Sequence, residues 1–156
     1  MRQGQAFKVS TMIKAQSAPV SAADFTCASV DTTGFEDVTV VFHVGVTDTA
    51  LTVLKLVESN DDSTWTDVTG GNYSSSPPSG TDDGRTWAWR LLAAAHKRYL
   101  KIVATVDTAY AGDPEAIPDP IPADLGATAT AFAILSGAQQ APDTATERGL
   151  NYEATV

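Results

Sequence analysis

The stretch DVTVVFHVGV, residues 37–46, decides the fold class of this chain. Its apolar residues recur at every second position, and the positions between them are mostly polar. Successive side chains of a β-strand point to opposite faces, so this period predicts a strand with one buried face. We expect the buried face to carry Val38, Val40, Phe42, Val44 and Val46, and the other face Asp37, Thr39, His43 and Thr47.

Further segments show the same period or a related pattern. ALTVLKLVES (residues 50–59) and RTWAWRLL (85–92) each alternate along the chain. RYLKIVATV (98–106) does the same, and Leu100 and Ile102 are its expected core residues. ATATAFAILSG (127–137) is apolar on both faces, which is typical of a strand covered on both sides or lying at a subunit contact. These strands predict an antiparallel all-β sandwich with a jelly-roll-like form.

Helices and irregular segments set the domain organisation. Only LLAAAHKR (residues 91–98) favours a helix, and at this length it predicts at most one turn in a connection. The four prolines at positions 114, 118, 120 and 122 predict an extended loop over residues 111–126. We therefore expect an N-terminal arm at 1–20, one sandwich domain at 21–137 and a C-terminal tail at 138–156. Deleting residues 1–18 or 141–156 should then spare the sandwich.

Composition limits the possible partners. The 156 residues suit one domain, and no apolar run reaches the ~20 residues of a membrane helix. The formal net charge of −9 opposes binding to a phosphate backbone, so nucleic acid is not an expected partner. The N-terminus has no apolar segment of the kind found in secretory signals, which predicts synthesis in a host cytoplasm.

The acidic stretch LKLVESNDDSTWTDV contains three aspartates and raises the question of a metal loop. A calcium loop needs ~6 to 8 oxygen ligands and usually a glycine at its sharp bend. The stretch has neither that spacing nor a downstream bidentate glutamate, whereas Asn, Asp and Ser are typical turn residues. We interpret it as a hairpin in which substitution of Asp61 or Asp62 has a small effect and calcium has none.

Other candidate residues lack a reactive pattern. Cys27, the single cysteine, is more typical of a small buried hydrophobe in a strand than of a reactive thiol. His43 and His96 show no metal-ligand spacing, so we expect structural or surface roles for both. Glu58 and Asp67 can approach each other across the hairpin, but such a pair indicates glycosidase chemistry only inside a cleft. The sequence therefore predicts no catalytic residue, no cofactor site and no metal site.

The three tryptophans leave one alternative open. Trp65, Trp87 and Trp89 can form an exposed aromatic platform for a sugar, or they can pack into the core. Their position beside alternating apolar residues favours core packing for at least two of them.

The segments FEDVTVVFHVG, LKLVESNDDSTWTDV, KRYLKIVATV and ATAFAILSG, in this order, carry a family resemblance. Over most of residues 25–137 the chain resembles small all-β structural proteins of the head-morphogenesis regions of tailed bacteriophages, including capsid decoration or cement proteins. The resemblance implies a non-enzymatic protein on the capsid exterior that binds the major capsid protein as a homo-oligomer, with a trimer favoured. The proline-rich loop or the C-terminal tail would serve as the docking element.

Two other function classes remain as alternatives. A virion receptor-binding or carbohydrate-binding module would expose its tryptophans, and a glycan hydrolase fragment would need a cleft with converging carboxylates.

Overall fold

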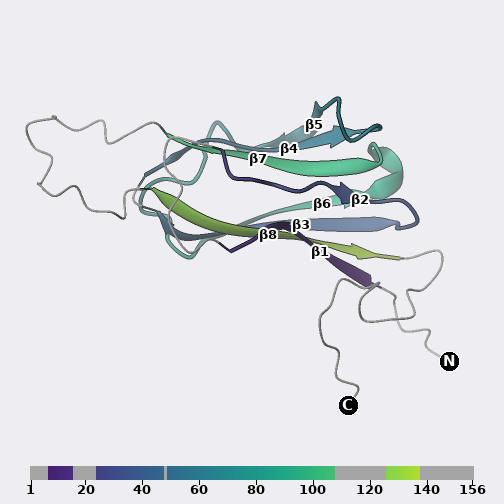
Figure 1. Ribbon diagram of the computed structural model, residues 1–156, viewed down its shortest axis with the longest axis horizontal. Coiled ribbons are helices and arrows are strands. Elements are labelled where there is room, and N and C mark those ends of the chain that lie inside the picture. Colours follow the sequence, from purple (N-terminus) through teal and green to yellow (C-terminus); the bar gives the residue numbers. More distant parts are fainter. Residues whose placement is uncertain (1–6, 16–23, 48, 108–125, 138–156) are drawn as a thin grey trace, which may run out of the picture.

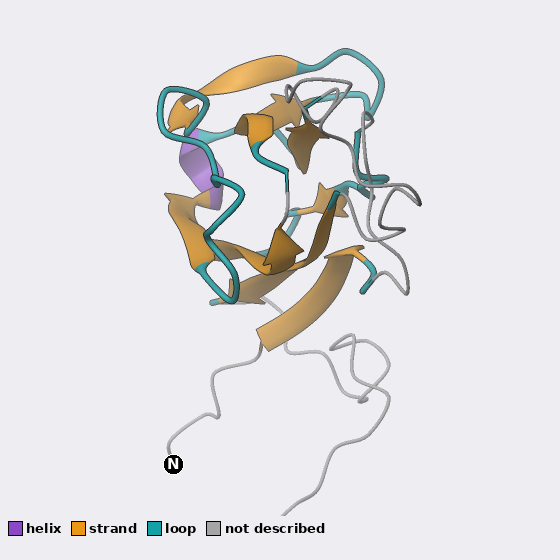
Figure 2. Cartoon of the chain, turned by 90° about the vertical axis from the view of Figure 1, so that its left-hand side faces the viewer, coloured by secondary structure: helices purple, strands orange, loops and turns teal. Residues whose placement is uncertain are grey.

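Two antiparallel four-stranded sheets pack face to face in the computed structural model, which describes residues 7–15, 24–47, 49–107 and 126–137. Figure 1 shows the two layers from the side, and Figure 2 shows them along the strands. The strands are β1 (Phe7–Ile13), β2 (Val30–Asp31), β3 (Asp37–Thr47), β4 (Leu51–Ser59), β5 (Thr66–Asn72), β6 (Thr86–Leu92), β7 (Tyr99–Val106) and β8 (Ala127–Ser136).

The strand order of the two sheets follows from nested antiparallel pairs. One sheet has the order β1-β8-β3-β6 and the other β2-β7-β4-β5. The pairs β1·β8, β2·β7, β3·β6 and β4·β5 are those of one long hairpin folded at the β4–β5 turn. Folding that hairpin over adds the pairs β3·β8 and β4·β7, which join the strand pairs into two four-stranded sheets. The antiparallel all-β sandwich predicted from the period of two is confirmed.

The core lies between the sheets and follows the predicted alternation. Val38, Val40, Phe42, Leu100 and Ile102 are each at most 1% exposed, which confirms the five expected core residues. Because inward residues of facing strands meet in one layer, alternate positions of the two sheets fill a single hydrophobic core.

The alternation of β3 breaks near its end, where the sequence prediction is wrong. Val46 is 53% exposed and Thr47 is 1% exposed, the reverse of the expected faces. Val44 pairs with Ala129 and Thr47 with Ala127, so β3 takes three steps where β8 takes two. This β-bulge turns the later side chains to the opposite face. Gly45 permits it, because a Cβ there would collide with the hydroxyl of Thr128.

Thr47 is a polar residue on the buried side, and its hydrogen bonds explain how it is accommodated. Its backbone N–H and its hydroxyl both donate to Oδ1 of Asp83, at 2.7 and 2.8 Å. The buried donors are therefore satisfied by a carboxylate from the β5–β6 connection.

The expected N-terminal arm is too wide. Phe7–Ile13 forms strand β1, which pairs with β8 and buries Met12 and Ile13. The sequence of this segment shows no clear alternation of apolar and polar residues. The strand lies at the edge of the sheet, and a register shift between Thr11 and Ile13 leaves two successive residues, Met12 and Ile13, buried. Deleting residues 1–18 would remove this edge strand and its two core residues, Met12 and Ile13, so that deletion would not spare the sandwich. Residues 1–6, 16–23 and 138–156, like the proline-rich segment 108–125, lie outside the described residues.

Two smaller expectations have different outcomes. Ala93–Ala95 forms one short 3-10 turn between β6 and β7, which confirms the single turn expected there. Cys27 is half-buried and packs against the core, but it lies in the segment before β2 and not in a strand. Burial raises the pKa of its thiol to about 11, so the thiol is neutral at pH 7.

The bulge predicts unequal effects of the same substitution two residues apart. Val44→Thr puts a hydroxyl into the core, and an unsatisfied buried donor costs about 1–3 kcal/mol. Val46→Thr lies at an exposed position and should change stability by less than about 0.5 kcal/mol. Chemical denaturation of both variants and the wild type measures the difference. Equal losses would contradict the bulge and restore an unbroken alternation.

Candidate functional site

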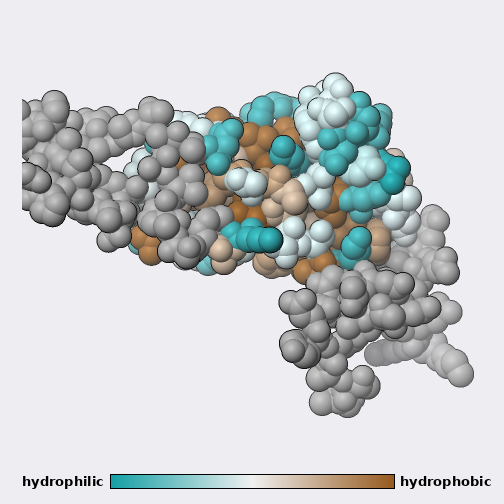
Figure 3. Space-filling view, in the orientation of Figure 1, coloured by the Kyte–Doolittle hydropathy of each residue, from teal (hydrophilic) through white to brown (hydrophobic). Residues whose placement is uncertain are grey.

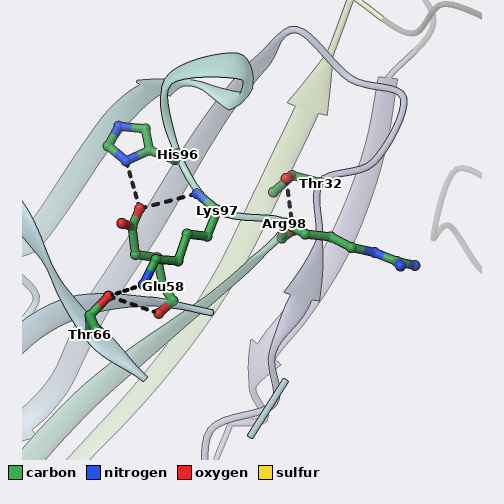
Figure 4. A network of polar contacts seen from close by, with 6 residues as sticks. All are labelled: Thr32, Glu58, Thr66, His96, Lys97 and Arg98. Atoms are coloured by element: carbon green, nitrogen blue, oxygen red, sulfur yellow. Dashed lines mark hydrogen bonds and ion pairs between the residues drawn. The ribbon is translucent and has the colours of Figure 1, made fainter. Parts of the chain in front are cut away.

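The densest polar cluster of the described residues lies at one end of the sandwich, where the β6–β7 connection meets β4 (Figure 4). Glu58, near the end of β4, accepts hydrogen bonds from Nδ1 of His96 at 2.9 Å and from the backbone N–H of Lys97 at 3.3 Å. The Lys97 ammonium donates to Oγ1 of Thr66 at 2.6 Å. These bonds fasten the connection to the β4–β5 hairpin.

The pairing of β4 with β7 directs the Glu58 side chain toward the inside of the sandwich. Glu58 pairs with Leu100 of β7 and with Thr66 of β5, and Leu100 is a core residue. A half-buried carboxylate in this position needs donors, and the connection after the 3-10 turn supplies them. The cluster contains an acid and an imidazole, but no serine, threonine or cysteine is hydrogen-bonded to His96 among the described residues. Its geometry fits a structural clamp.

Arg98 forms a second fastening beside this clamp. Its guanidinium donates to both carboxylate oxygens of Asp31, with Nη2 at 2.7 Å from Oδ2 and Nε at 3.1 Å from Oδ1. Its backbone carbonyl accepts the hydroxyl of Thr32 at 2.8 Å (Figure 4). The hydrogen bonds from Arg98 lower the pKa of Asp31 from 3.8 to about 2. Sequence reasoning missed this pair because its partners lie in separate segments with no local motif.

The acidic hairpin is organised by one of its aspartates. Asp61 Oδ1 accepts the hydroxyl of Ser59 at 2.8 Å and the backbone N–H groups of Ser63 and Thr64 at 3.0 and 2.7 Å. These donors, with the Thr64 bond the strongest, hold the pKa of Asp61 well below its usual range. Asp62 has a φ of 57°, the left-handed conformation that aspartate tolerates in turns.

Asp61 therefore uses its oxygens on the turn itself. No group of three or more His, Cys, Asp or Glu side chains with metal-binding geometry occurs in the described ranges. The hairpin interpretation accounts for the acidic stretch, and Figure 3 shows hydrophilic residues gathered over this end of β4 and β5.

Glu58 and Asp67 are not brought together. Asp67 pairs with the ammonium of Lys55 at 2.8 Å and sits opposite Val57, on the outer face of the sheet, whereas Glu58 faces the clamp. Each carboxylate has its own cation or donor. The arrangement of two carboxylates flanking a scissile bond is absent at this hairpin.

The two histidines are likewise separate. Nδ1 of His43 lies 3.0 Å from the hydroxyl of Thr86, its cross-strand neighbour on the outer face of the other sheet. His96 belongs to the clamp described above. Both have the structural or surface positions expected from the sequence.

A shallow groove runs between the edge strands β5 and β6. Its volume is about 280 Å³, near the lower end for small-molecule sites. A second hollow, of about 270 Å³, lies on the other side of β6 against β3. The hollow between β5 and β6 is lined by Tyr73, Trp89, Arg90 and His96 with Thr69, glycine and apolar neighbours. No Asp or Glu of the part of the chain that the structure describes lines it, so these residues do not supply an acid for sugar hydrolysis.

The tryptophans divide between core and surface. Trp89 is buried, and its indole N–H donates to the carbonyl of Gly71 at 3.0 Å. Trp87 is partly buried and packs edge-on against Phe42. The expected core packing of at least two tryptophans is confirmed. Trp65 is half-exposed, and the ammonium of Lys101 lies 5.4 Å from its ring centroid, so this ring is already partly covered.

Comparison with known proteins adds little to these contacts. No family model matches the sequence, and no curated protein does. Among solved structures, the SPBc2 prophage-derived protein YomS is similar, with 13% identity and a TM-score of 0.49 over 88% of this chain and 98% of that chain. We rest no functional conclusion on a likeness of this degree. No helix in the described part of the chain is long and apolar enough to span a bilayer.

The Asp31–Arg98 pair predicts a pH-dependent contribution to stability. Because folding lowers the Asp31 pKa from 3.8 to about 2, the pair stabilises the fold above pH 4 and loses its effect as the pH falls from about 4 to about 2. Asp31→Asn should therefore lower the melting temperature at pH 7 and match the wild type near pH 2. Thermal unfolding at both pH values measures this. An equal gap at both would show that the charge of Asp31 is not responsible.

The acidic hairpin gives a matched pair of substitutions. Asp61→Ala removes the acceptor of several turn hydrogen bonds, whereas Asp62→Ala removes a side chain for which no such bonds are seen. We expect Asp61→Ala to lower the melting temperature more than Asp62→Ala, and added calcium to shift none of the three proteins. A calcium-dependent rise that either substitution abolishes would reveal a metal site instead of a turn.

Proposed function

We propose that this chain is a non-enzymatic structural protein that decorates and stabilises the outer surface of a tailed-phage capsid. The observation that carries the proposal is that the polar residues able to do chemistry are committed to holding the sandwich. Glu58, His96 and Arg98 bond to neighbouring segments of the fold, and Asp61 bonds to its own turn. The family resemblance of the strand segments supplies the capsid context.

A rigid sandwich suits this role. Long-range strand pairs join each sheet, and hydrogen bonds to Glu58 hold the β6–β7 connection against β4. The sandwich can therefore present its loops in a fixed geometry. Repeated over a shell, weak contacts add up through effective concentration, and no enzyme-like pocket is needed. The proposed partner is the major capsid protein, bound by a homotrimer of this chain.

The charge supports an exterior position. A protein with a net charge of −9 inside a shell would add to the repulsion among packaged phosphates. On the outside, the same charge favours solubility and contact with basic patches of a shell protein. Synthesis in the host cytoplasm followed by addition to the shell completes this proposal.

The alternative is a virion receptor-binding or carbohydrate-binding module. One observation favours it, since Trp65 remains half-exposed on the sheet that contains β4 and β7. The nearby aromatic Tyr99 has the guanidinium of Arg98 over its ring at 4.8 Å. Both rings are partly occupied by cations of the chain itself, which makes a free stacking platform for sugar the weaker of the two proposals.

The test is binding to capsid shells prepared without this protein. The intact chain should co-sediment with the shells, and either deletion of residues 141–156 or replacement of residues 111–125 by a glycine–serine linker should weaken that binding. Both changes leave every described strand in place, so folding is matched by comparing melting temperatures. The deletion of 1–18 is unsuitable because it removes β1.

Two results would contradict the decoration role. One is unchanged shell binding after both alterations combined, and the other is an intact chain that ignores shells but binds immobilised glycans. In the second case Trp65→Ala should abolish glycan binding, which would move the assignment to the carbohydrate-binding alternative.

A further inference from the structure

The outer face of the β1-β8-β3-β6 sheet carries apolar residues from all four strands, among threonines and a few other polar residues. Register places the outward residues of the four strands in rows, so that Val9, Ile134 and Thr39 lie beside Arg90 in one row. The next row joins Thr11, Phe132, Val41 and Ala88. We call this surface the β8 face; its apolar members are Phe7, Val9, Val41, Ala88, Leu92, Phe132 and Ile134.

The apolar residues of the β8 face are not covered by a second layer of described strands. Phe7 is 37% exposed and Leu92 is 64% exposed, and the five between them are half-buried or exposed. The inner side of β8 is different, since Ala131, Ala133 and Leu135 are fully buried in the core. Of the two apolar faces of residues 127–137, one therefore fills the core and the other lies on the outer side of the sheet.

Charge indicates what kind of partner fits. Among the outward positions of these four described strands, the charged residues are Asp37 and Arg90, one of each sign. Neither forms an ion pair with another described residue. The chain has a net charge of −9, but the two charges on the β8 face cancel, so two copies can approach there without like-charge repulsion from the face itself.

Self-complementarity follows from the same two residues. When β8 faces of neighbouring copies meet, Asp37 of one copy can pair with Arg90 of the next, and the apolar rows exclude water around them. The four strands are 7 to 11 residues long, and at ~4.8 Å between strands and ~3.3 Å per residue they span a projected area of roughly 550 Å². A specific interface buries about 800 Å² of accessible surface per partner, so this corrugated face supplies most of what is needed.

The chain's own tail is a poorer occupant. Residues 138–156 follow β8 in sequence and contain three large apolar side chains, Leu150, Tyr152 and Val156, against six on the face when Ala88 is left out. The tail also has a net charge of −2, from Asp143, Glu147 and Glu153 against Arg148. It matches the face less well than a second face does.

We propose that the β8 face is the surface through which copies of this chain associate, with Asp37 of one copy paired to Arg90 of its neighbour. This inference deepens the proposed function, because it assigns the surface of the homo-oligomer on which capsid decoration rests.

The experiment measures the mass of the full-length chain in solution by light scattering and sedimentation across a concentration series. Val41→Lys places a charge at the centre of the β8 face, and Val53→Lys places the same charge at a half-buried outward position of the opposite sheet. We expect the intact chain and Val53→Lys to form the same oligomer. Val41→Lys should raise the subunit dissociation constant at least tenfold, with an unchanged circular dichroism spectrum.

A charge swap keeps the test independent of any folding defect at Val41. Arg90→Glu should weaken association, and Asp37→Arg combined with Arg90→Glu should restore part of it. An intact chain that is monomeric, or an oligomer that both Val41→Lys and Arg90→Glu leave unchanged, would overturn the proposal. A monomer that associates only after removal of residues 141–156 would assign the β8 face to the tail and overturn it as well.

The outcome is separable from the capsid proposal, because association is measured without shells. A dimer that Val41→Lys dissociates would support the β8 face and contradict the trimer. A chain that fails to associate but still binds shells would leave the decoration role standing and remove only the inference about this surface.

Discussion

The fold depends on the position of β8 between β1 and β3. Strand β8 is last in sequence but second in its sheet, and its inner alanines pack where larger side chains of facing strands need room. Without it, β1 has no partner in the sheet and β3 loses one side of its ladder. Because β3 and β8 are far apart in the sequence, their pairing costs loop-closure entropy before the buried contacts between them can stabilise the fold. The sandwich is therefore complete only when its last strand docks.

Carboxylates hold the connections at the end of the sandwich. Glu58 and Asp31 accept hydrogen bonds from another segment, and Asp61 accepts hydrogen bonds from its own turn. The bonds to Asp31 and Asp61 lower the pKa of these two carboxyls, so both are stabilised as anions. The same bonds hold the connections in place, so these side chains serve the fold itself.

Sequence pattern succeeded where one face of a strand is fully buried. The alternation in β3 and β7 identified Val38, Phe42 and Ile102 as core residues. An inward position needs an apolar residue whichever strand lies beside it, so the pattern can be seen without knowing the strand order. It failed at Val46 and Thr47, where a bulge set by the close approach of Gly45 to Thr128 inverts the faces. It failed also for β1, an edge strand with a register shift, and for Cys27, which packs on the core from a loop. Each failure arises from a contact with a distant segment.

The sequence by itself determined the class of fold, the hairpin nature of the acidic stretch and the absence of a reactive motif. These depend on alternation, turn propensity and local spacing, which are properties of neighbouring residues. Only the tertiary structure decided that Glu58 turns away from Asp67 to meet His96, and that Asp31 pairs with Arg98. It also gathered apolar residues of four strands into the β8 face. Such groupings depend on strand order and register, and these are fixed by the packing of the whole chain rather than by any one stretch.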